Sequence, residues 1–181
     1  KTNAIPIVRE YDIVVTHAGF AGINHYQAAK AACEAAKAVK RGGTVILAAN
    51  CTDVHPVGGS DYRQVLPMLT ELGPNMLNAR LRGPDWTFVP EQWEAQKWAQ
   101  AFMKLGSMNG LVFCAPRLTG DVFTKYRVPG VDGGAGLAMN NERVLAAAMV
   151  QRALDAFVSR PLCRVARDCS TRTPPRRGQP P

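Results

Sequence analysis

The 181-residue chain lacks several patterns that indicate a function class directly. No apolar run approaches the roughly 18 residues of a membrane span, and the first ten residues lack the apolar core of a signal peptide. Five cysteines, at positions 33, 51, 114, 163 and 169, form no Cys-x-x-Cys pair. This cysteine usage favours buried free thiols and a cytoplasmic location.

Histidine is also scarce, since His17, His25 and His55 are the only three in the sequence. They show neither the His-x-x-x-His nor the His-Glu-x-x-His spacing of a helical metal site. We therefore expect no metal ion and no other cofactor to be bound by this chain alone.

The net charge of +8 is concentrated at the C-terminal end. Residues 159–181 contain six arginines against one acid, Asp168, which gives +5, together with five prolines and no aromatic residue. Without aromatic side chains to stack on bases, this segment does not favour nucleic-acid binding. We predict a domain over residues 1–158 and a largely disordered tail over 159–181. The first residue, Lys1 rather than Met, suggests a fragment or a trimmed chain.

Strand and helix patterns alternate along the chain, with no internal repeat. Periodicity and turn residues predict strands at 12–16, 44–50 and 110–115, helices at 25–39, 61–72, 91–104 and 141–158, and a glycine-rich loop over 120–136. This order indicates an α/β fold, a small mostly parallel sheet with helices on both faces.

The segment Asn24–Lys30 lies between a glycine turn and an alanine-rich helix. A strand that leads through such a turn into a helix start predicts an anion site made by free backbone N–H groups. Tyr26 and Lys30 are four residues apart and share a helix face. Asn24 is a plausible N-cap, and Gln27 would complete a variant capping box. The alternative is a solvated lysine beside a packed tyrosine.

The turn also permits a second interpretation as a degenerate dinucleotide loop. Gly19 and Gly22 fit such a loop, but Ala18 stands beside Gly19, and Asn50 replaces the acid expected after the next strand. A nucleotide-binding oxidoreductase domain is therefore one alternative function. A non-catalytic interaction domain, with the basic tail on an acidic partner, is the other.

Residues 12–115 resemble the C-terminal domain of the nickel-pincer lactate racemase (LarA-like) family. The resemblance rests on the strand and turn after Asp12, on Asn24-x-Tyr26-Gln27-x-x-Lys30, on the segment Gly42–Leu47 and on Glu91–Gln96. It covers about three fifths of the chain, and the tail after Ser159 has no counterpart.

The resemblance implies two domains that close over a cleft. The missing N-terminal domain would hold nickel in a pincer nucleotide and supply the catalytic histidines, and a 2-hydroxy acid would be racemised by hydride removal and return. This chain would supply substrate contacts: Gln27 and Lys30 to the carboxylate, Tyr26 and Trp93 along the cleft. It would be inactive without its N-terminal partner domain.

The turn departs from the family pattern, which has paired glycines followed by proline and an acid. Here it is Ala18-Gly19-Phe20-Ala21-Gly22, so the pocket around His17, Gly19 and Asn24 is expected to differ and the substrate need not be lactate. We expect His25 to point into solvent at the first helical position.

Trp93 lies close in sequence to two other tryptophans, Trp86 and Trp98. One or two of the three are expected in the core because of their size. Trp93 is the one that the resemblance assigns to the site.

Overall fold

The computed structural model describes residues 6–137 and 142–158. In the second of these ranges, side chains are described from residue 146 onward. The tail predicted over 159–181 lies outside the described residues. No helix in the described part is long and apolar enough to cross a membrane.

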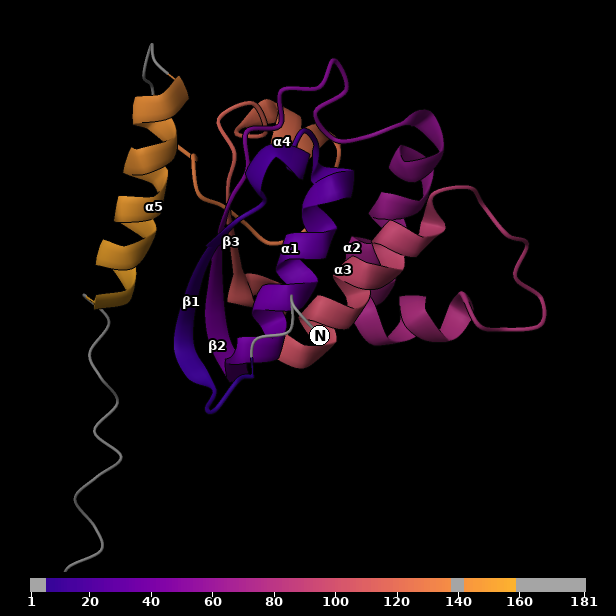
Figure 1. Ribbon diagram of the computed structural model, residues 1–181. Helices are drawn as coiled ribbons and strands as arrows, with labels where there is room; N and C mark the ends of the chain where they lie inside the picture. Colours follow the sequence, from indigo (N-terminus) through magenta and orange to yellow (C-terminus); the bar gives the residue numbers. More distant parts are fainter. Residues whose placement is uncertain (1–5, 138–141, 159–181) are drawn as a thin grey trace, which may run out of the picture.

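The sheet consists of four parallel strands in sequential order, as Figure 1 shows in part. They are β1 (Tyr11–His17), β2 (Val39–Ala48), β3 (Leu111–Cys114) and β4 (Val131–Asp132). Val15 pairs with Ile46 and Ile46 with Val112, which sets the register of the first three strands. Right-handed crossovers that step in one direction place their helices on the same face of the sheet.

Three helices form the layer on that face: α1 (His25–Ala38), α2 (Ser60–Arg80) and α3 (Gln92–Leu105). α1 and α3 pack on the strands, and α2 packs against α3. α5 (Glu142–Val158) lies on the opposite face (Figure 1). The prediction of helices on both faces of a parallel sheet is confirmed.

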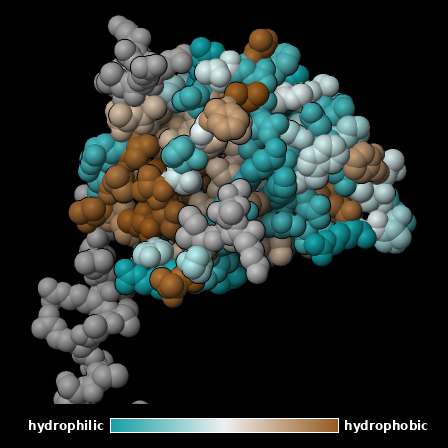
Figure 2. All heavy atoms as spheres, in the orientation of Figure 1, coloured by the Kyte–Doolittle hydropathy of each residue, from teal (hydrophilic) through white to brown (hydrophobic). Residues whose placement is uncertain are grey.

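Successive side chains of β2 point to opposite faces of the sheet, and this explains the two hydrophobic cores. Val45 and Leu47 are fully buried in the core beneath α1 and α3, whereas Ile46 is buried on the other face with Cys114 and with Met149 of α5. α5 packs mainly over β2 and β3. Figure 2 accordingly shows hydrophobic side chains at the surface over β1, where Val15 is 50% exposed.

Several element boundaries differ from those that the sequence predicted. The helix expected to end at Gly73-Pro74 resumes after a kink at Gly73 and continues to Arg80. β2 begins at Val39, so Gly42-Gly43 lies inside the strand, where the register with β1 is irregular. The predicted glycine-rich loop contains α4 (Asp121–Lys125) and β4. Two short 3-10 turns, η1 (Gly19–Ala21) and η2 (Met108–Gly110), precede α1 and β3.

Candidate functional site

Asn24 caps the N-terminus of α1. Its backbone is extended, and its side-chain oxygen accepts a hydrogen bond from the backbone N–H of Gln27 at 2.9 Å. Its amide nitrogen donates to the Asp53 carboxylate at 2.8 Å, and the residue is 7% exposed. The predicted N-cap is therefore present, and both side-chain heteroatoms of Asn24 have partners within the chain.

The backbone N–H groups at the start of α1 are not available to an anion, contrary to the expectation from the sequence. His25 N donates to the Pro56 carbonyl at 2.8 Å, and Tyr26 N donates to the Val57 carbonyl at 3.0 Å. The loop after β2 thus lies over the helix start. Any anion at this site must be held by side chains.

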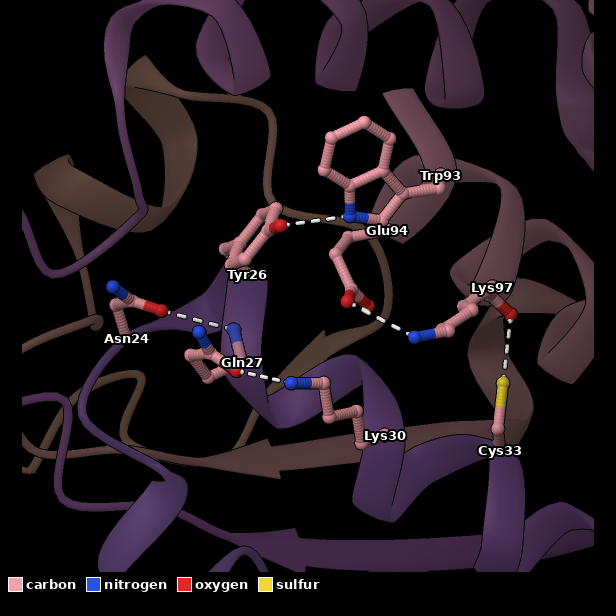
Figure 3. Close-up of polar contacts among 8 residues, drawn as sticks. All are labelled: Asn24, Tyr26, Gln27, Lys30, Cys33, Trp93, Glu94 and Lys97. Carbon is pink, nitrogen blue, oxygen red and sulfur yellow. Dashed lines mark hydrogen bonds and ion pairs between the residues drawn. The ribbon is translucent and has the colours of Figure 1, made fainter. Parts of the chain in front are cut away.

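The side chains of Gln27 and Lys30 are the polar groups that remain. The Lys30 ammonium donates to Gln27 Oε1 at 2.6 Å, and Lys30 is exposed. Figure 3 shows the two side chains turned toward each other along α1. The Gln27 amide therefore contacts Lys30 instead of completing a capping box. An ammonium has three donors, so two remain for another acceptor.

Tyr26 and Trp93 meet although they are 67 residues apart. Trp93 Nε1 donates to the Tyr26 hydroxyl at 2.8 Å, which joins the starts of α1 and α3 (Figure 3). Trp93 is 43% exposed and stacks on Phe88 at 6.0 Å between ring centroids. Burial is the largest influence on the Tyr26 hydroxyl and raises its pKa. These three rings form an aromatic surface whose phenol is neutral at pH 7.

His25 lies in the core, so its predicted exposure to solvent is wrong. It is fully buried, its Nδ1 lies 2.8 Å from the Tyr62 hydroxyl, and its ring stacks on Trp98 at 4.4 Å. Burial lowers the pKa of His25 to about 3. The cause is tertiary, because the rings of Tyr62, Trp98 and Phe113, which pack on the imidazole, come from distant elements. The imidazole is consequently neutral and remote from solvent.

His17 and Gly19, the other expected pocket residues, contact each other in the turn after β1. Gly19 N donates to His17 Nδ1 at 3.1 Å, so His17 stabilises η1. Phe20, at the centre of η1, is 97% exposed. The turn thus presents an imidazole and a phenyl ring at the carboxyl end of β1.

Three further residues near the helix starts were not singled out from the sequence. Tyr62 is fully buried, and its backbone N–H donates to Glu91 Oε2 at 3.3 Å, which joins the starts of α2 and α3. Glu94, 2% exposed, pairs with Lys97 of the same helix at 3.0 Å. The burial of Glu94 could have been suspected from the sequence, because Trp93 and Ala95 flank it. The contacts of Tyr62 and Glu91 depend on loop geometry and were not detectable.

The three cysteines that the structure describes are free thiols, as predicted, and two of them are fully buried. Cys51 and Cys114 are buried, and Cys33 is half-buried and donates to the Lys97 carbonyl at 3.1 Å. Burial raises the pKa of Cys51 and of Cys114 to about 12, so both thiols are protonated at pH 7. Cys163 and Cys169 lie outside the described residues.

Two features argue against a dinucleotide site. The helix N–H groups that would hold a pyrophosphate are bonded to the loop after β2. The strand order β1-β2-β3-β4 also has no reversal, whereas dinucleotides bind where the strand order of an open sheet reverses.

Comparison with known proteins identifies the family. A family model for the lactate racemase C-terminal domain matches residues 8–109. No curated protein matches the chain.

Among solved structures, the chain matches the lactate racemase apoprotein from Thermoanaerobacterium thermosaccharolyticum at 28% identity. The match covers 59% of this chain and 24% of that protein, with a TM-score of 0.44, so the chain spans about a quarter of its length. Because the family model covers more than half of the residues, the chain belongs to the lactate racemase C-terminal domain family.

Proposed function

We propose that this chain is the substrate-binding part of a nickel-pincer-nucleotide-dependent 2-hydroxy-acid racemase or epimerase. In this proposal it contacts the substrate at a cleft shared with an N-terminal catalytic domain. The observation that carries the proposal is the pairing of Tyr26 with Trp93 beside the Gln27–Lys30 pair. The family membership supports the reaction class.

Gln27 and Lys30 are suited to a carboxylate. Because Gln27 Oε1 accepts from Lys30, the amide nitrogen of Gln27 keeps its two donors for another group. The exposed ammonium adds a positive charge one turn into the helix, where the macrodipole also favours an anion. Together they offer charge-assisted hydrogen bonds to one carboxylate.

Tyr26, Trp93 and Phe88 are suited to the apolar side of the same substrate. Two of them are exposed, Phe88 at 61% and Trp93 at 43%, so a substrate can reach them. Exclusion of water by these rings protects the carbon from which a hydride is removed. The hydrogen bond to Trp93 fixes the Tyr26 hydroxyl at the edge of this surface.

The residues that the structure describes do not form a nickel site. In ranges 6–137 and 146–158, no group of three His, Cys, Asp or Glu side chains is arranged to hold a metal ion. The proposal assigns the nickel-pincer nucleotide to the N-terminal domain, in keeping with the family membership. Cys33, Cys51 and Cys114 are free thiols, which supports a reducing, cytoplasmic setting for the whole protein.

The test uses the complete two-domain protein charged with the nickel-pincer nucleotide. It is incubated with single enantiomers of a series of 2-hydroxy acids, and the enantiomer ratio is followed by chiral chromatography. We expect at least one acid to approach a one-to-one mixture. A fully charged protein that converts none of them, combined with a thermal shift on addition of NAD or NADP, would contradict the proposal and favour the oxidoreductase alternative.

A further inference from the structure

Tyr62 contacts both helix starts that carry the aromatic pair of the site. Its ring packs edge-on against the Tyr26 ring, with centroids 5.2 Å apart and an interplanar angle of 84°. Its hydroxyl bonds to His25, the residue before Tyr26. Its backbone N–H donates to Glu91, two residues before Trp93. One fully buried residue of α2 thus connects the starts of α1 and α3.

Two glycines make this close approach possible. A Cβ at Gly58 would lie 2.8 Å from the Tyr62 ring and 3.0 Å from Tyr26 Cβ, and one at Gly59 would lie 2.8 Å from the Glu91 carboxylate. The two separations of 2.8 Å are closer than real Cβ contacts, and 3.0 Å is unusually tight. Any larger residue at either position must therefore displace one of the groups that Tyr62 holds.

The start of α3 is fixed from its other side as well. Glu91 adopts a left-handed backbone with φ of 65°, and Gln92 Oε1 accepts from Trp86 Nε1 at 2.7 Å and from Val89 N at 2.8 Å. The hydrogen bond from Tyr62 of α2 to Glu91 therefore links α2 to the start of α3, where Trp93 lies.

We propose that Tyr62 is a positioning residue that holds Tyr26 against Trp93, with Gly58 and Gly59 providing the space for its contacts. The effect of Tyr62 on turnover rests on the proposed function, but its effect on the Tyr26–Trp93 hydrogen bond does not. The ring of Tyr62, more than its hydroxyl, sets the placement of Tyr26. Loss of the ring releases the Tyr26–Trp93 hydrogen bond and widens the aromatic surface.

The direct test is the indole N–H spectrum of the 15N-labelled 181-residue chain, which contains three tryptophans. Trp93→Phe assigns the Trp93 signal, and Tyr26→Phe gives its position without the hydrogen bond. We expect Tyr62→Leu to move the signal to that position and Tyr62→Phe, which keeps the ring, to leave it in place. A folded Tyr62→Leu protein with an unmoved Trp93 signal would overturn the proposal.

Leu69→Ala is the matched control, because Leu69 is also fully buried in α2. It should lower the unfolding midpoint without moving the Trp93 signal, and an equal displacement in this variant would make Tyr62 merely structural. If Tyr62→Leu does not fold, Tyr62→Met decides the question, because it also removes the ring and keeps a long apolar side chain. The Trp93 signal of the folded Tyr62→Met protein should move, and an unmoved signal would again overturn the proposal.

Turnover is the second readout. In the complete charged protein, Tyr62→Leu should raise KM for the 2-hydroxy acid about tenfold while kcat changes much less, because the Tyr26–Trp93 pair contacts the substrate equally in the ground state and the transition state. An unchanged KM with a displaced Trp93 signal would show that the pair's position does not matter to substrate. A wild-type protein that racemises nothing would contradict the proposed function alone, because the indole spectrum would still decide the role of Tyr62.

Discussion

At the residue scale, two lysines of α1 allow a matched comparison. Lys30 donates to the neutral amide of Gln27, whereas Lys37, about two turns later, pairs with the carboxylate of Glu34 at 2.6 Å. Both are exposed. Only Lys30 lies beside the aromatic pair, so only Lys30 should contribute to substrate binding.

We predict that Lys30→Ala in the complete protein lowers kcat/KM by the equivalent of about 1.5–3 kcal/mol, the scale of a charge-assisted hydrogen bond. The unfolding midpoint should barely change, because the ammonium is exposed. Lys37→Ala should alter neither quantity. Equal kcat/KM for the two variants would make Lys30 an ordinary solvated residue.

His25 predicts a specific pH dependence of stability. Its pKa is about 3 in the folded protein and near 6.5 when unfolded, so the unfolded state binds more protons between these values. Stability from the neutral imidazole is fully present above pH 6.5 and is lost as the pH falls toward 3. Between pH 7 and pH 5 this loss should amount to about 2 kcal/mol.

Urea unfolding at the two pH values measures this loss. A His25→Phe variant removes the titrating group, so its free energy of unfolding should fall less over the same interval, even if the variant is less stable at pH 7. The same pH-dependent loss in both proteins would mean that other groups account for it.

Single residues also show how far the sequence allowed prediction. The resemblance pointed to Tyr26 and Trp93 individually, but their hydrogen bond depends on how α1 meets α3. The exposure expected for His25 was wrong because Trp98 and Phe113, which pack on its ring, come from distant elements. A local pattern cannot indicate which distant groups will cover it.

At the scale of elements, α1 brings the site together because it is rich in alanine. Ala28, Ala29, Ala32 and Ala36 are buried to 2% exposure or less, and α1 packs closely on α3. Small side chains permit this close approach of two helices. This close packing allows Tyr26 to reach Trp93.

The kink in α2 gives a prediction at this scale. Gly73 has φ of 76° and ψ of 162°, a conformation open essentially only to glycine. We predict that Gly73→Ala lowers the free energy of unfolding by about 1–3 kcal/mol. Asn75→Ala, at an exposed position two residues later, should change it by less than about 0.5 kcal/mol. Similar small effects for both substitutions, measured by urea unfolding, would contradict the assigned strain.

The main strands and helices were predictable because their periodicity is strong. The extension of β2 through Gly42-Gly43 was not, because it depends on pairing with β1. α4 and β4 were missed because elements of five and two residues leave too short a pattern among glycines. Likewise, the free N–H groups expected at α1 are occupied by a loop whose path the sequence does not specify.

At the scale of the whole molecule, the described residues contain no ready group of three metal ligands. We predict that the 181-residue chain binds no nickel stoichiometrically. Elemental analysis after gel filtration in the presence of nickel should find only background metal. A one-to-one nickel content that survives the column would contradict the assignment of the cofactor to another domain.

The central claim is that the Tyr26–Trp93 surface and the Gln27–Lys30 pair contact one substrate. The most direct measurement is a titration of the complete 15N-labelled protein with a 2-hydroxy acid, followed through its indole N–H signals. The Trp93 signal should shift and saturate, whereas the signals of the half-buried Trp86 and the buried Trp98 should not. Lys30→Ala should move saturation to a much higher concentration of the acid, and Lys37→Ala should leave it unchanged. A Trp93 signal that stays fixed while the same protein racemises that acid would contradict the account.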